Sequence, residues 1–168
     1  MGPMLPKLLE GAGATIHTFI PDPAAYEKTL PPMDKVVEGK DKLNLKNWGG
    51  LAEAYLFAGN KDKAESIYEE FVKASKTVFE PTETYLAAVE GDFGMVYFNE
   101  KNYEKAEPLL LDSARLMEAN LTYAISNNLI SNYLCLSLIR DNQGNKEEAA
   151  KYASKLVDIA KRQREKTL

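Results

Sequence analysis

Apolar residues recur at intervals of three or four along much of the chain, and the clearest example is the stretch from Trp48 to Tyr68. This is the spacing of side chains on one face of an α-helix. The residues on that face are Trp48, Leu51, Ala52 and Tyr55. Gly59 then ends the helix, because glycine adopts the left-handed cap conformation without a steric penalty. Asn60 is a favourable N-cap for a second helix, so the stretch predicts two helices joined by a tight turn.

The same pattern occurs three times at intervals of about 42 residues. An alanine marks the inner face of each second helix, and an asparagine stands four residues before it at the expected N-cap. These pairs are Asn60 with Ala64, Asn102 with Ala106, and Asn145 with Ala149. Each first helix places a large residue beside a small one, as in Leu51-Ala52, Phe93-Gly94 and Leu136-Ser137. Small residues let one helix approach another and large ones fill the adjoining gaps, so we expect three packed helix pairs.

The motif from Trp48 to Ala64 resembles the tetratricopeptide repeat (TPR) family, whose pattern is W-x2-L-G-x2-Y…A-x3-F…P over 34 residues. The resemblance covers about residues 45–160. The terminal proline of the motif is absent, and the period is longer than the family's. Lengthened repeats of this kind are similar to those of kinesin light chains. The third copy also has Arg140 where the first two have tyrosine. The resemblance implies an all-α fold, a right-handed α–α superhelix of three TPR-like helix pairs.

We predict one TPR-like domain over residues 41–168, with repeats at about 41–80, 81–120 and 121–168. The expected helices span about residues 41–58, 61–78, 82–100, 103–119, 122–142 and 146–165.

Residues 1–40 form an N-terminal extension outside the repeats. Its prolines and glycines exclude one long helix, while Asp22-Pro23 predicts a short helix that ends near Leu30. The segment carries too many apolar residues for a solvated tail. We expect it to pack on the repeats as a cap. The alternative is that it fills a binding groove or exchanges with a second subunit, which would give a homo-oligomer.

Charge and composition limit the classes of partner. The net charge of −4 argues against a nucleic-acid binder, which needs a basic surface. No apolar run reaches the roughly 20 residues of a membrane span. The single cysteine fits a reducing compartment such as the cytoplasm without requiring one. Met1-Gly2-Pro3 is typical of a cloning remnant, so secretion or a lipid anchor stays open.

Candidate catalytic and metal-binding residues lack the neighbours that such chemistry needs. His17 is the only histidine and has no cysteine near it, which argues against a zinc site. Cys135 lies in an apolar helix with no histidine in the repeats to activate it, so we expect a buried thiol. Gly11-x-Gly13 lacks the strand, turn and helix of a dinucleotide loop. We therefore expect no enzyme, no cofactor and no metal site.

The TPR resemblance implies a concave groove lined by the first helix of each pair. The residues that the family register places there are Glu53, Leu56, Phe57, Gly91, Asp92, Met95, Phe98, Asn99, Leu134, Leu138 and Asp141. TPR domains that hold a peptide's C-terminal carboxylate use Lys, Asn and Arg at such positions, so a carboxylate clamp is disfavoured here. The groove is expected to be apolar in the middle and acidic at its rim, which favours a partner with Lys or Arg beside apolar anchors.

Gly49, Gly50 and Gly91 on the same faces each weaken their helix by roughly 1 kcal/mol relative to alanine. Either a partner approaches the backbone there, or another helix of the chain does. Two functions follow from these features. The first is a non-catalytic module that binds a peptide or helix of a partner protein in the groove. The alternative is a structural or assembly protein whose residues 1–40 fill the groove in the same or a neighbouring subunit.

Overall fold

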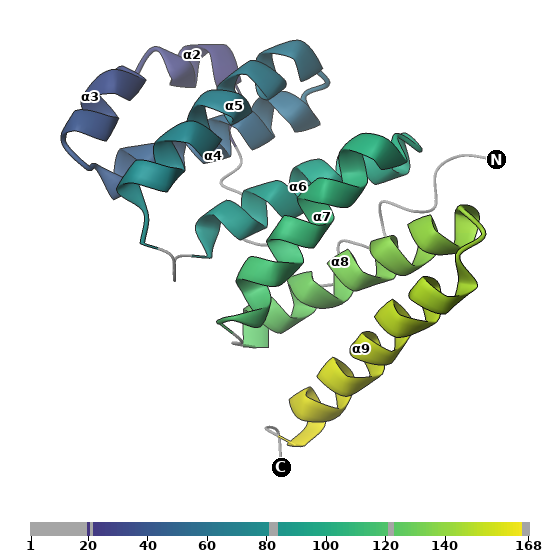
Figure 1. The fold of residues 1–168 in the computed structure, drawn as a ribbon. Helices are drawn as coiled ribbons and strands as arrows, with labels where there is room; N and C mark the ends of the chain where they lie inside the picture. Colours follow the sequence, from purple (N-terminus) through teal and green to yellow (C-terminus); the bar gives the residue numbers. More distant parts are fainter. Residues whose placement is uncertain (1–19, 21, 81–83, 121–122, 166–168) are drawn as a thin grey trace. The chain divides into compact units, whose positions relative to one another are not determined.

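The computed structural model describes residue 20 and residues 22–80, 84–120 and 123–165. Over these ranges the chain forms helices and no strands, which confirms the all-α prediction (Figure 1). The helices are α2 (Pro23–Glu27), α3 (Met33–Glu38), α4 (Lys42–Phe57), α5 (Lys61–Val78), α6 (Tyr85–Asn99), α7 (Tyr103–Glu118), α8 (Tyr123–Asn142) and α9 (Lys146–Glu165). The six long helices lie within a few residues of their predicted bounds.

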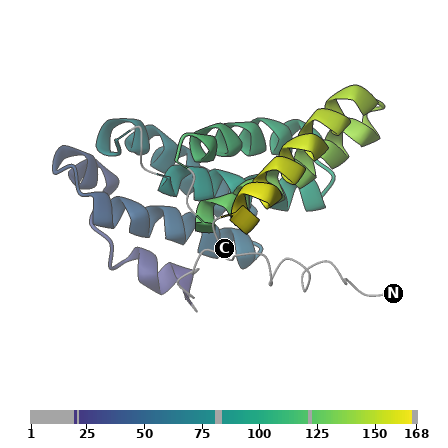
Figure 2. The ribbon, with the colours of Figure 1, turned by 90° about the horizontal axis from the view of Figure 1, so that it is seen from below.

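The described residues divide into two compact units, and the boundary along the chain lies inside α6. The first unit ends at Val89 and contains α2 to α5 with the start of α6. The second begins at Glu90 and contains the rest of α6 with α7, α8 and α9. Within the units the helices pack in adjacent pairs, such as α4 with α5 and α8 with α9. The α8–α9 pair lies side by side in both views (Figure 1, Figure 2).

The turn inside each helix pair is built in the same way all three times. A residue with positive φ follows each first helix: Gly59 (81°), Lys101 (60°) and Gly144 (79°). The backbone N–H of the next residue, an asparagine, then bonds a carbonyl five residues back. These bonds are Asn60 to Tyr55, Asn102 to Tyr97 and Asn145 to Arg140, each 2.9 Å. This left-handed residue and long bond are the marks of a Schellman cap, so the turns share one geometry although Lys101 replaces a glycine.

The asparagines stand where the second helices begin, but they do not all cap them through the side chain. Asn102 accepts a bond from the Lys105 N–H at 3.3 Å, and Asn145 accepts one from Glu148 at 3.2 Å. Asn60 occupies the N-cap of α5 without such a bond. The side-chain caps predicted from the sequence are therefore present on α7 and α9, and absent on α5.

The small and large positions of the motif lie in the core. The alanines at the inner face of the second helices, Ala64, Ala106 and Ala149, are all buried. A Cβ placed on Gly94 would lie 2.8 Å from Cγ of Leu110. The backbone of α6 at Gly94 therefore packs directly against the Leu110 side chain of α7. Only a residue without a side chain permits this approach.

The short helix α2 packs on α4, and α3 packs on both α4 and α5, within the first unit. Asp22 caps α2 by accepting the Ala25 N–H at 3.0 Å, and Pro23 is its first residue, as the sequence predicts. Trp48 of α4 donates its indole N–H to the carbonyl of Pro31 at 3.1 Å. Helix α3 was not predicted from the sequence, since Pro32 stands at its N-cap and makes no side-chain cap bond.

Candidate functional site

The groove residues predicted on α4 differ in how much surface they present. Glu53 and Leu56 are buried, whereas the Phe57 side chain is 58% exposed at the end of the helix. Leu56 and Glu53 therefore present little surface to a partner, and Phe57 is the residue of this group that a partner could reach.

On α6, the predicted groove residues are mostly covered. Gly91 is buried, and a Cβ there would lie 3.0 Å from the Ser113 hydroxyl and 3.2 Å from the amide oxygen of Asn132. Asp92, Met95 and Phe98 are half-buried, and Asn99 is exposed. The Phe98 ring also lies 5.8 Å from that of Tyr103 at the start of α7. The close neighbours of Gly91 belong to α7 and α8, so the small residue there serves packing within the chain.

On α8, the two predicted leucines are exposed. Leu134 is 47% and Leu138 43% exposed, although both are large apolar residues. They are four residues apart, which places them one turn apart on the same face of the helix. Asp141, one turn further on, is also exposed and is paired with Lys146 of α9 at 2.5 Å.

The two adjacent glycines of α4 differ in their surroundings: Gly49 is closely packed, whereas Gly50 has room for a side chain. A Cβ on Gly49 would lie 2.8 Å from Cε1 of Tyr85 and 3.0 Å from Cε2 of Phe71. A Cβ on Gly50 would meet nothing closer than the Tyr85 hydroxyl at 3.6 Å, an ordinary contact. Gly49 therefore serves helix packing, and the same packing gives no reason for a glycine at Gly50.

The family model for the tetratricopeptide repeat matches residues 45–77, which are most of α4 and α5. Residues 45–77 form a tetratricopeptide repeat. Comparison with curated proteins and with solved structures gave no match. The likeness of the longer period to kinesin light-chain repeats stays a prediction.

The tetratricopeptide repeat of α4 and α5 is tied to α2 by a polar contact that the sequence did not reveal. Tyr55, the tyrosine of the motif, donates its hydroxyl to Glu27 at 2.8 Å, and Lys63 pairs with the same carboxylate at 2.7 Å. Burial and the bond to Glu27 raise the pKa of Tyr55 to about 12. Burial alone would raise the pKa of Glu27, but the bonds from Lys63 and Tyr55 outweigh it and hold that pKa below its usual value. The partner of Tyr55 lies outside the repeat, so no pattern within the repeat predicts it.

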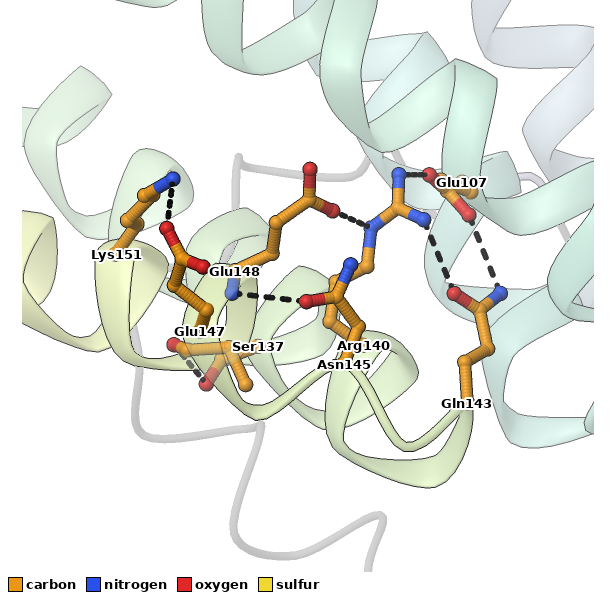
Figure 3. Close-up of polar contacts among 9 residues, drawn as sticks. Glu107, Ser137, Arg140, Gln143, Asn145, Glu147, Glu148 and Lys151 are labelled. Carbon is orange, nitrogen blue, oxygen red and sulfur yellow. Dashed lines mark hydrogen bonds and ion pairs between the residues drawn. The ribbon is translucent and has the colours of Figure 1, made fainter.

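The third helix pair departs from the repeat at Arg140, and the departure has a structural reason. Arg140 stands at the motif's tyrosine position on α8 and pairs with Glu107 of α7 and, at 2.9 Å through Nε, with Glu148 of α9 (Figure 3). Gln143 donates to the same Glu107 at 3.5 Å and accepts from Arg140 at 3.1 Å. The guanidinium thus joins three helices. The sequence showed that Arg140 breaks the motif, but not which acids it meets.

A second polar cluster joins the same three helices at the middle of α9. Tyr133 of α8 donates its hydroxyl to Glu118, and Lys155 of α9 lies 3.0 Å from both of these groups. The Tyr133 ring stacks on Tyr152 at 5.8 Å. Burial and the bond to Glu118 raise the pKa of Tyr133 to about 12. In this cluster the Tyr133 hydroxyl, the Glu118 carboxylate and the Lys155 ammonium group all bond one another. Such a closed set of bonds is typical of a structural contact and not of a reactive site.

The other residues considered for catalysis or metal binding show no sign of such chemistry in the part of the chain that the structure describes. Cys135 is buried, as predicted, and burial raises the pKa of its thiol to about 11, so it is a poor nucleophile. His17 lies outside the described residues. Among the residues that the structure describes, no group of His, Cys, Asp or Glu is arranged to hold a metal ion. A search of the same residues found no helix long and apolar enough to span a membrane.

Proposed function

We propose that the chain is a non-catalytic interaction module that binds a peptide or helix of a partner protein through the exposed apolar residues of its first helices. Tetratricopeptide repeats generally mediate protein–protein interactions. The net charge of −4 favours a protein over a nucleic acid as the partner.

The observation that carries the proposal is the exposure of Leu134 and Leu138 on α8. The family register predicts that both positions lie on the concave face through which tetratricopeptide repeats bind their partners. Apolar side chains of this size are the usual anchors of a helix or peptide partner. Leu111 of α7 is exposed to a similar degree, 36%, but lies on a second helix of a pair, away from the predicted face.

The test is selection of peptides from a random library on the immobilised full chain, followed by titration of the selected peptides by fluorescence anisotropy. Leu134→Glu and Leu138→Glu are each expected to weaken binding about tenfold or more, as for central interface residues. Leu111→Glu is the matched control and is expected to leave affinity unchanged. Circular dichroism verifies that each variant keeps its helices. A selection that yields no binder, or binders that tolerate both α8 variants, would overturn the proposal.

A further inference from the structure

Helix α8 shows an exposed face that carries little charge. Of the residues from 127 to 142, only Arg140 and Asp141 are charged. The Arg140 guanidinium is held by Glu107 and Glu148 toward the neighbouring helices (Figure 3). Asp141 is paired with Lys146. The rest of the face consists of the two exposed leucines, the half-buried Ile130 one turn before Leu134, and the polar residues Asn127, Ser131 and Asn142.

The acidic rim expected from the sequence is therefore reduced in this unit to Asp141, which is exposed but already paired with Lys146. Asp92 is half-buried and its Oδ2 atom is shielded from solvent. A basic residue of a partner that approached Asp141 would share this carboxylate with Lys146, which is bonded to Oδ1. The new pair would be exposed, and exposed pairs contribute only about 0–1 kcal/mol, so it would add little to affinity.

We propose that α8 recognises an uncharged amphipathic helix, with apolar anchors for Leu134 and Leu138 flanked by side chains such as Ser, Asn and Gln. This inference rests on the proposed function and specifies the partner's chemistry. Leucines one turn apart form a ridge, and a ridge packs into the groove between residues of a second helix. A charged residue of the partner above the leucines would lose hydration without gaining a counter-ion. Acidic and basic residues of the partner are therefore both disfavoured at that place.

The peptides selected on the wild-type chain test the inference. We expect their anchors to be flanked by neutral residues, and their dissociation constants to change less than about twofold between low and high salt, since screening acts on charges. Placing Lys or Glu beside the anchors is expected to weaken binding or leave it unchanged. Enrichment of Lys and Arg in the selected peptides, with affinity that falls as salt is added, would overturn the uncharged partner while the dependence on the leucines still supported the module.

A variant of the ion pair sharpens the test. Lys146→Met removes the partner of Asp141, so a repeated selection is expected to enrich peptides that carry Lys or Arg. Lys151→Met is the control, because Lys151 pairs with Glu147 on α9 and not with α8; it is expected to leave the neutral preference unchanged. Identical preferences in the Lys146→Met variant and the wild type would show that Asp141 does not face the peptide, and would contradict the inference. Binding that ignores the leucines would instead contradict the proposed function itself.

Discussion

Replacing Gly49 with alanine adds one methyl group to α4 where two aromatic rings already lie against the backbone. The new Cβ would be 2.8 Å from Tyr85 and 3.0 Å from Phe71. Neither ring can move away easily. The Tyr85 hydroxyl is bonded to the Lys46 carbonyl at 2.8 Å, and the rings of Phe71, Phe79 and Tyr85 contact one another edge to face at 6.1–6.3 Å.

The magnitude follows from two opposing effects. Alanine favours the helix over glycine by about 1 kcal/mol, while forcing extra volume into a packed core costs about 1–3 kcal/mol. Gly49→Ala should therefore lower the free energy of unfolding by about 0–2 kcal/mol. Gly50→Ala gains the same propensity and meets only an ordinary contact at 3.6 Å, so it should raise the free energy of unfolding by up to about 1 kcal/mol. Both variants gain the same helix propensity, so this contribution cancels when their free energies of unfolding are subtracted. The difference then measures the cost of packing alone, about 1–3 kcal/mol.

Urea denaturation followed by circular dichroism gives both free energies. The Tyr85→Ala background supplies a further control, since removal of this ring should reduce the cost of Gly49→Ala. If Gly49→Ala proves as stable as Gly50→Ala, the rings do not pack against this glycine and the account of α4 is wrong.

Three other predictions concern caps and pH. Lys101→Gly should raise the free energy of unfolding by about 0.5–1 kcal/mol, because Lys101 has positive φ; no gain in thermal or urea melts would argue against that turn. Asn102→Ala should cost about 1 kcal/mol and Asn60→Ala clearly less, because Asn102 caps its helix through its side chain and Asn60 does not; equal losses would contradict this. Burial alone would raise the pKa of Glu118, but the bonds from Tyr133 and Lys155 lower it below its usual value. The stability that Glu118 supplies is present above the usual glutamate pKa and lost as pH falls through the lower folded pKa, so Glu118→Gln should flatten the acid limb of a stability titration, and an unchanged limb would refute the contact.

The helices of this chain were predictable because their signals are local. Positions three and four apart fix each apolar face, and the turn between the helices of a pair needs only Gly59 or its equivalent. The asparagine at the expected N-cap, Asn102, kept the second turn in register although Lys101 stands there in place of a glycine. Helix α3 was missed because its start at Pro32 carries no capping side chain.

The candidate site was less predictable because burial depends on partners far along the chain. The sequence placed Leu56 and Leu138 on the same kind of face, yet Leu56 is buried and Leu138 is exposed. The sequence predicted Asp141 as part of an acidic rim, and its ion pair with Lys146 across the α8–α9 turn was not predicted. The reason for Gly49 likewise lies in Phe71 and Tyr85, residues that no local pattern connects to it.

The most direct test of the central claim is mapping of a selected peptide onto the full chain by changes in amide and methyl chemical shifts in NMR. If the exposed face of α8 binds the partner, the largest changes fall on Leu134, Leu138 and the serine and asparagine residues beside them. Changes that instead centre on α7 or α9, with α8 undisturbed, would contradict the claim.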